Sequence, residues 1–221
     1  MAIVYLLRHC ESLANENGIL AGRSDVGLSA KGANQAQLLV PTLRKLGVDQ
    51  IISSPINRCI ETITPYLEID RRLKKKFLLA PEFQEMDYGL WSGKKLRQLA
   101  LKREWRKVKK DPVNFTFPEG ESFQEAAARV SVGLAALSKL PAKSKILLIS
   151  HGDIIKIAIQ QVLGSPFPSF QQLVIDPASL SAISTSKPAA ILFINRSSSE
   201  PESSKAEIRS RTALGGGTRR G

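Results

Sequence analysis

Short apolar runs alternate along this chain with longer stretches in which apolar residues recur at helical spacing. Apolar runs of strand length occupy residues 3–7, 51–52, 146–149, 173–175 and 190–194. The stretches between them are long enough for helices of ordinary length. Strands that alternate with helices predict an α/β fold with a mainly parallel central sheet.

Capping residues mark where several of these helices begin and end. Ser29 has the character of an N-cap, and Gly47 is placed to end the same helix. Pro55 is predicted to lie in the first turn of the next helix. Ser122, followed three residues later by Glu125, predicts a capping box at the start of a third helix.

The pattern predicts one domain over residues 1–194. We expect a three-layer α/β/α sandwich with helices on both faces of the sheet. Charged and aromatic residues interrupt the alternation over about residues 78–118, which we interpret as a small cap. Residues 195–221 are rich in Ser, Gly and charge and lack an apolar period, which predicts a disordered basic tail.

The composition of the 221 residues, with 43% apolar and 24% charged, is typical of a globular protein. No apolar run approaches the roughly 18 residues of a membrane span, and the N-terminal run has no features of a signal peptide. We therefore expect a cytoplasmic protein with no membrane partner. The two cysteines, Cys10 and Cys59, are expected to be buried free thiols, although oxidation would alter activity if they adjoin a reactive site.

The formal net charge is +12, and much of it lies in two basic runs, at residues 71–76 and 101–110. This charge is compatible with nucleic-acid binding, but no aromatic residue lies in the first run to stack on a base. We expect instead a field that attracts a small anionic substrate, preferably one with additional negative charge such as a sugar phosphate or a phosphoglycerate. A basic nucleic-acid-binding protein without catalysis is kept as an alternative.

The only two histidines share the same local setting. His9 and His151 each follow an apolar run and one polar residue, Arg8 or Ser150, and each precedes a small residue and a carboxylate. Ligands of open α/β sheets bind beyond the carboxyl ends of the strands. If the two strands are neighbours, both imidazoles therefore face one crevice.

Four kinds of site compete for such a pair. Two buried core histidines would not explain the identical placement. A zinc site lacks a third ligand at suitable spacing, so no metal is expected. A serine hydrolase would need a G-x-S-x-G stretch, which is missing from the sequence. The fourth site uses a neutral imidazole as nucleophile toward phosphorus, with Arg8, Arg58 and a protonated His151 around the phosphoryl oxygens and with the amides of the following helix facing them.

Six segments, taken in order, resemble the histidine phosphatase superfamily, also called phosphoglycerate mutase-like. They are RHCESLAN, GRSDVGLSAKG, SSPINRCIET, FQEMDYGLWSG, FPEGESFQEAAARV and ISHGDIIK, and the resemblance covers about residues 3–194. Within the family the sequence is similar to an actinobacterial branch labelled phosphomutase. The family's usual Gly after the nucleophile is here Cys10, whose thiol is expected to point into the sheet.

The resemblance implies a role for each matched position. His9 would be the nucleophile that becomes phosphohistidine, with Arg8, Arg58 and His151 clamping the phosphoryl group. Glu85 would be the general acid and then the base; the residues alone leave Asp87 and Glu82 equally open.

The remaining implied positions bind substrate, and they are Ser12, Asn15, Gly22 and Gly152. The resemblance implies a metal-independent phosphomonoesterase with no cofactor. A phosphoglycerate mutase-type phosphomutase is the alternative, and the sequence leaves open whether the chain is a monomer or a dimer.

Overall fold

The computed structural model describes residues 2–185 and 188–197. One sheet of six strands runs through the molecule in the order β3-β2-β4-β1-β5-β6. The strands are β1 (Ile3–Arg8), β2 (Gln50–Ser53), β3 (Phe77–Leu79), β4 (Lys145–Ser150), β5 (Leu180–Ser184) and β6 (Ala190–Arg196). The first four pair in parallel, whereas β5 and β6 are antiparallel to their neighbours, so the sheet is mainly parallel as predicted.

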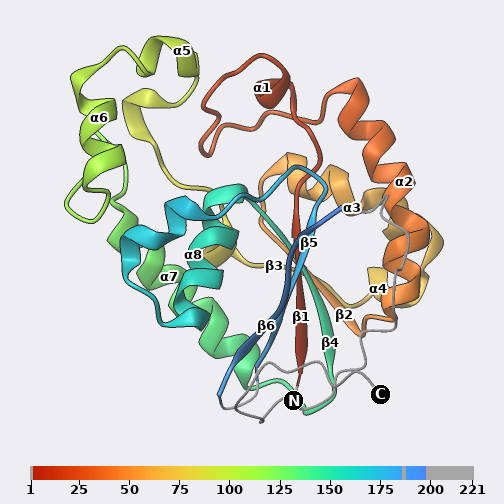
Figure 1. Cartoon of the computed structure of the whole chain (residues 1–221). Helices are drawn as coiled ribbons and strands as arrows, with labels where there is room; N and C mark the ends of the chain where they lie inside the picture. The colour runs from red at the N-terminus through yellow and green to blue at the C-terminus, as the bar shows by residue number, and fades with distance from the viewer. Residues whose placement is uncertain (1, 186–187, 198–221) are drawn as a thin grey trace, which may run out of the picture.

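Helices cover both faces of this sheet, which gives the predicted three layers (Figure 1). The α-helices are α1 (Leu13–Glu16), α2 (Ala30–Leu46), α3 (Asn57–Ile69), α4 (Arg71–Lys74), α5 (Leu96–Leu99), α6 (Arg103–Lys110), α7 (Phe123–Ser138) and α8 (Gly152–Leu163). Helices α2, α3 and α4 lie on one face, and α7 and α8 lie on the other (Figure 1). Three short 3₁₀ helices, η1 (Pro81–Phe83), η2 (Gly89–Trp91) and η3 (Phe167–Gln172), complete the described elements.

Each face of the sheet has its own apolar core. The core under α2 and α3 includes Leu39, Leu43 and Ile63, which are fully buried. The core under α7 and α8 continues into the segment that carries α5 and α6 through an aromatic cluster. In that cluster Trp91 stacks on Trp105, with ring centroids 5.9 Å apart. The cluster fixes α6 against the rest of the molecule, because apolar burial and ring contacts both contribute there.

The capping residues behave mostly as predicted. Ser29 caps α2, Gly47 ends it in the left-handed conformation, and Ser122 forms the capping box with Glu125 at the start of α7. The prediction for Pro55 is wrong, because α3 begins only at Asn57.

One predicted strand does not form, and two strands were not predicted. Residues 173–175 follow η3 and form no strand. The Ile175 carbonyl accepts a hydrogen bond from Arg8 Nη1 and takes no part in strand pairing. Strand β3 was not predicted, and Leu78 and Leu79 pair with β2, so the segment outside the sheet starts after residue 79. Strand β5 was missed as well, since two serines interrupt its apolar pattern.

The predicted disordered tail begins two residues too early, because Asn195 and Arg196 are the last residues of β6. The rest of that prediction, from residue 198 onward, lies outside the described residues. In the described part of the chain, no helix is both long and apolar enough to cross a membrane.

The register of the sheet brings the two histidine segments together. Strands β1 and β4 are parallel neighbours, and Arg8 at the end of β1 is paired with Ser150 at the end of β4. The next residue in each chain segment is a histidine, and the His9 amide donates to the Ser150 carbonyl at 2.9 Å. The adjacency that the sequence argument required is therefore present.

Candidate active site

A cavity of about 190 Å³ opens beyond the carboxyl ends of β1 and β4. Its walls come from segments far apart in the sequence: the end of β1, the loop after α1, the start of α3, the loop before η2, and the start of α8. The predicted residues among its lining are Arg8, His9, Ser12, Asn15, Gly22, Arg58, Glu85 and Gly152. His151 is completely buried immediately behind this wall.

Both ring nitrogens of His9 are hydrogen-bonded, Nδ1 as a donor and Nε2 as an acceptor from Arg58 Nε at 3.3 Å. Its Nδ1 lies 2.6 Å from the carbonyl oxygen of Cys10. A carbonyl only accepts, so Nδ1 carries the proton and Nε2 does not. Burial, followed by the charges of Arg58 and Arg8, holds the pKa of His9 well below its usual value. A neutral imidazole with an unprotonated Nε2 is the form of histidine that acts as a nucleophile.

His151 carries its proton on the opposite nitrogen. Arg58 Nη2 donates to His151 Nδ1 at 3.1 Å, so the proton lies on Nε2, which donates to Ser54 Oγ at 2.8 Å. Burial, together with Arg58, lowers its pKa well below the usual value. The expectation of a protonated His151 is therefore wrong for the site as it stands. The centroids of the two imidazole rings are 5.2 Å apart.

Arg58 connects the two imidazoles. Its Nε lies 3.3 Å from His9 Nε2, and its Nη2 also donates to the carbonyl of Gly22 at 2.8 Å. The residue is 1% exposed. Within the described chain no carboxylate oxygen lies within 4 Å of this guanidinium. A buried cation without a paired anion is unfavourable by itself, so the geometry favours an anionic ligand at this position.

Arg8 is the second guanidinium of the cavity. Its Nη1 donates to the carbonyl of Ile175 at 2.6 Å, and its buried Nε has no hydrogen-bond partner. A Cβ at Gly152 would lie 3.3 Å from that Nε, so glycine leaves room for the arginine beside the first turn of α8. An unsatisfied N–H at the N-terminus of a helix adds to the anion-binding character of the site.

Three further predicted residues line the same cavity. Ser12 and Asn15 form a capping box at the start of α1, in which Asn15 Oδ1 accepts from Ser12 Oγ at 2.9 Å. Gly22 has a φ of +57°, and a Cβ there would lie 2.6 Å from Ser92 Oγ. Glycine is therefore required for the turn that brings the Gly22 carbonyl to Arg58.

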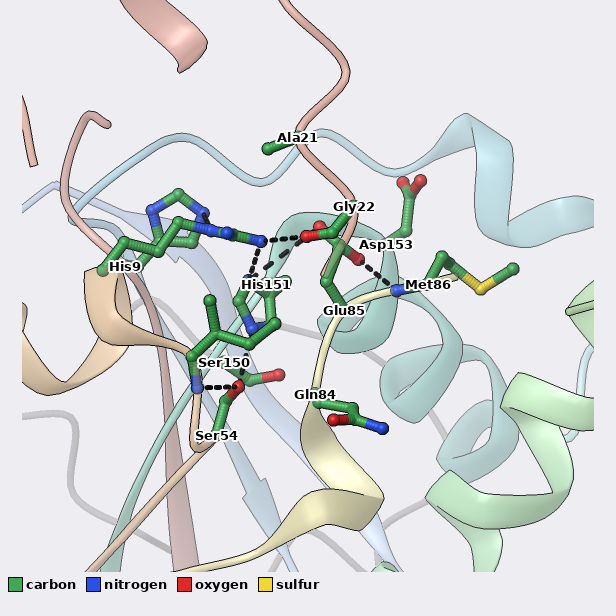
Figure 2. Close-up of polar contacts among 12 residues, drawn as sticks. His9, Ala21, Gly22, Ser54, Gln84, Glu85, Met86, Ser150, His151 and Asp153 are labelled. Atoms are coloured by element: carbon green, nitrogen blue, oxygen red, sulfur yellow. Dashed lines mark hydrogen bonds and ion pairs between the residues drawn. The ribbon is translucent and has the colours of Figure 1, made fainter. Parts of the chain in front are cut away.

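Glu85 faces His151 from the opposite wall. Figure 2 shows both side chains next to the backbone of Gly22, and Glu85 Oε2 is 3.9 Å from His151 Nδ1. Burial is the main cause that raises the pKa of Glu85 to about 7, and the charge of Asp153 adds to it. Such a carboxyl group holds a proton near neutral pH and can still release it. Of the three carboxyl groups that the residues left open, Glu85 alone lines the cavity.

The backbone around Glu85 is held by an arginine that the sequence argument did not single out. Arg129 of α7 donates to the carbonyls of Glu82 at 2.8 Å, Gln84 at 2.7 Å and Glu85 at 3.1 Å. It is also ion-paired with Glu121 at 2.7 Å. The one sequence signal that points to Arg129 is a lone basic residue in a helix of mostly small apolar residues.

The two cysteines do not line the cavity. Cys10 and Cys59 are free and fully buried, as predicted, and burial raises the pKa of each thiol to about 12. A thiol in that state reacts slowly with oxidants, so the hypothesis that oxidation controls the site finds no support in their surroundings. The Cys10 side chain packs in the core, which agrees with the expectation that it leaves the pocket open.

Comparison with known proteins identifies the family to which this site belongs. The family model described as "Histidine phosphatase superfamily (branch 1)" matches residues 4–192. The chain belongs to the histidine phosphatase superfamily. A curated relative of this histidine phosphatase, "Probable phosphoglycerate mutase GpmB" of Enterobacter sp., is 34% identical over 188 residues, covering 83% of this chain and 85% of the relative.

Solved structures of other histidine phosphatases have the same fold. The alpha-ribazole phosphatase of Shigella flexneri has a TM-score of 0.77 and 28% identity, covering 88% of this chain and 96% of that one. A mycobacterial glucosyl-3-phosphoglycerate phosphatase also has a TM-score of 0.77, at 22% identity over 88% of this chain and 99% of its own. Members of the superfamily are phosphatases or mutases, and these relatives include both kinds of name.

Proposed function

We propose that this histidine phosphatase is a metal-independent phosphomonoesterase that acts through a phosphohistidine at His9. The observation that carries the proposal is the pair of neutral imidazoles beside two guanidinium groups, the buried Arg58 and the half-buried Arg8, neither of which has a carboxylate partner in the described chain. His9 is then the nucleophile, and Arg8, Arg58 and His151 surround the position of a phosphoryl dianion.

In the first step, His9 Nε2 attacks phosphorus while the bond from phosphorus to the leaving oxygen breaks. Glu85, protonated near neutral pH, donates its proton to that oxygen, so the product leaves as an alcohol. In the second step, a water molecule attacks the phosphohistidine, and the Glu85 carboxylate takes the water's proton. The phosphorus–nitrogen bond breaks, and its electron pair returns to Nε2 as inorganic phosphate forms.

The remaining residues bind the phosphoryl oxygens. Arg8 and Arg58 supply donors with full positive charge, and Gly152 supplies the first backbone position of α8. Asn15 and Ser12 contribute polar groups to the lining of the cavity. A bound dianion would raise the pKa of His151, because a nearby negative charge stabilises the imidazolium, and its Nδ1 would then donate to the phosphoryl group.

The alternative is a phosphoglycerate mutase-type transfer, which the names of the curated relatives favour. A mutase uses the same nucleophile and clamp but returns the phosphoryl group to a second hydroxyl of the substrate. We place the enzyme in the cytoplasm because Cys10 and Cys59 are free thiols, which persist in a reducing compartment.

The test is phosphate release from p-nitrophenyl phosphate and glycerol 3-phosphate in the presence of EDTA. We expect turnover that EDTA leaves unchanged and that falls at least about 10³-fold in His9→Ala. A matched control is Lys107→Gln, at an exposed position of α6 outside the cavity lining. Loss of activity with EDTA, restored by a divalent ion, or full activity in His9→Ala would contradict the proposal. Conversion of 3-phosphoglycerate to its 2-isomer faster than phosphate release would make the mutase the principal activity.

A further inference from the structure

Beyond the phosphoryl-binding groups Arg8, Arg58 and His151, the outer part of the cavity has a mostly apolar lining. It would contain the leaving group of a bound phosphoester. The residues that line this part are Ile19, Leu20, Ala21, Tyr88, Leu96, Asp153 and Lys156. The volume of about 190 Å³ is below the roughly 300–1,000 Å³ that is usual for drug-sized ligands, so the part of a substrate that the cavity encloses is small.

The apolar wall of this outer part is fixed by backbone hydrogen bonds. The Leu20 amide donates to the Lys94 carbonyl at 3.0 Å, and the Gly93 amide donates to the Leu20 carbonyl at 2.8 Å. The Leu96 amide donates to the Gly18 carbonyl at 2.8 Å. The loop after α1 and the turn before α5 therefore form one wall, from which Leu20 and Leu96 face the cavity.

The polar side of the outer part is a cluster with no net charge. The Tyr88 hydroxyl donates to Asp153 Oδ2 at 2.8 Å, and Lys156 Nζ donates to Asp153 Oδ1 at 3.2 Å. Both carboxylate oxygens are thus occupied, and the lysine charge is compensated by the carboxylate. Lys156 is the only lysine in the described lining of the cavity.

The basic runs of the sequence lie elsewhere. Helix α4 carries the first run and precedes β3, at the end of the sheet opposite to the cavity (Figure 1). No residue of α4 or α6 belongs to the cavity lining in the described structure. The side chains of these two runs therefore do not line the place where the leaving group would lie.

A second anionic group on the substrate would meet unfavourable partners in this outer part. It would meet an Asp153 carboxylate that already binds Lys156, and an apolar wall that cannot hydrogen-bond. In the view of Figure 2, Glu85 lies between His9 and Asp153. A charge placed against an apolar wall in a partly buried site is disfavoured.

We propose that this enzyme selects small phosphomonoesters whose leaving alcohol carries no charge, with Asp153 as the residue that holds Lys156 and so makes it unavailable to a second anion. This inference rests on the proposed function and names the substrate class of the same site. It reverses the expectation from the basic runs that substrates carry additional negative charge. It also makes phosphoglycerates and bisphosphates poor substrates.

The test compares glycerol 3-phosphate with 3-phosphoglycerate, which differ by a hydroxymethyl group in place of a carboxylate. We expect wild-type kcat/KM to favour glycerol 3-phosphate by at least about tenfold, equivalent to 1.4 kcal/mol. Asp153→Asn should reduce this ratio to less than about threefold, because the variant releases Lys156. Using the ratio cancels any effect of Asp153 on Glu85, which acts on both esters alike.

Two variants serve as controls. Lys156→Gln should increase the preference for glycerol 3-phosphate, whereas Lys107→Gln, on an exposed position of α6, should leave the ratio unchanged. The dissociation constants of the two esters with His9→Ala, measured by calorimetry, test the same preference without turnover. If wild type hydrolyses neither ester, the phosphatase proposal fails, and those constants still decide the selectivity. Equal or tighter binding of 3-phosphoglycerate, or a ratio that Asp153→Asn does not change, would overturn the inference.

Discussion

His9 and His151 bring the same side chain to one crevice but hold their protons on different nitrogens. The Cys10 carbonyl fixes the proton of His9 on Nδ1, and Arg58 and Ser54 fix that of His151 on Nε2. The sequence predicted that the two histidines share one crevice, because each directly follows a predicted strand and therefore lies at the carboxyl end of that strand. It did not predict their protonation, since that depends on burial and on Arg58, which comes from a third segment.

The leaving-group dependence of catalysis tests Glu85. An alkoxide needs a proton to leave, whereas a nitrophenolate is stable without one. Glu85→Gln should therefore slow hydrolysis of glycerol 3-phosphate by about 10²–10⁴-fold and slow formation of the phosphoenzyme from p-nitrophenyl phosphate much less. Single-turnover kinetics with both esters measure this difference. Equal slowing of the two would remove Glu85 from the role of general acid.

The raised pKa of Glu85 also predicts how stability depends on pH. Its pKa rises from 4.5 to about 7 on folding, so between these values the native state binds more protons than the unfolded state. Its stabilising contribution is therefore complete below about pH 4.5 and is lost as the pH rises through about 7. Relative to Glu85→Gln, wild type should lose on the order of 1–3 kcal/mol over this range.

Urea unfolding of both proteins between pH 5 and pH 8 measures that difference. The two histidines contribute to both proteins, so their effects largely cancel in the comparison. Parallel stability curves for the two proteins would show that the carboxyl group of Glu85 titrates normally in the folded state.

Individual elements were predicted well where a cap or an apolar run defined them, as for α2, α7, β1 and β4. Short elements were missed where their formation depends on neighbours. Strand β3 has only three residues and exists because β2 offers it an edge. The contacts of Arg129 were also out of reach, since the carbonyls that it holds lie 44–47 positions away in the sequence.

Arg129 acts at the scale of the element, because it joins α7 to the segment that carries Glu85. Glu121 receives a second ion pair, from Arg23 at 2.9 Å, so three charged groups hold this segment. Arg129→Met leaves Glu121 partly unpaired, and we expect a loss of about 3 kcal/mol in unfolding free energy. Displacement of Glu85 should lower kcat on glycerol 3-phosphate by about 10²-fold.

A leaving-group comparison separates positioning from a general structural effect. If Arg129 positions Glu85, its variant should slow the glycerol ester more than phosphoenzyme formation from the nitrophenyl ester. Arg106→Met, at an exposed position of α6, is the matched control and should alter neither rate. Equal slowing of both esters in Arg129→Met would show that the network serves stability alone.

At the scale of the whole molecule, the sheet order decides where the chemistry lies. Because β4 lies between β1 and β2, the residues after three parallel strands meet at one edge and form the cavity. Sequence patterns predicted the layers and that edge, but they did not predict that neither basic run contributes to the described lining of the cavity. Net charge is a property of composition, whereas its position depends on how the chain folds.

The central claim is that His9 Nε2 becomes phosphorylated during turnover. The most direct measurement is a rapid quench after brief exposure to ³²P-labelled p-nitrophenyl phosphate, followed by peptide mapping. The account predicts label on the peptide that contains His9, and this label should be stable in alkali and lost in acid. The amount of label should increase in Glu85→Gln, because hydrolysis of the intermediate then lacks its base. No label should form in His9→Ala. Turnover without any labelled intermediate, or label on another residue such as Ser54, would contradict it.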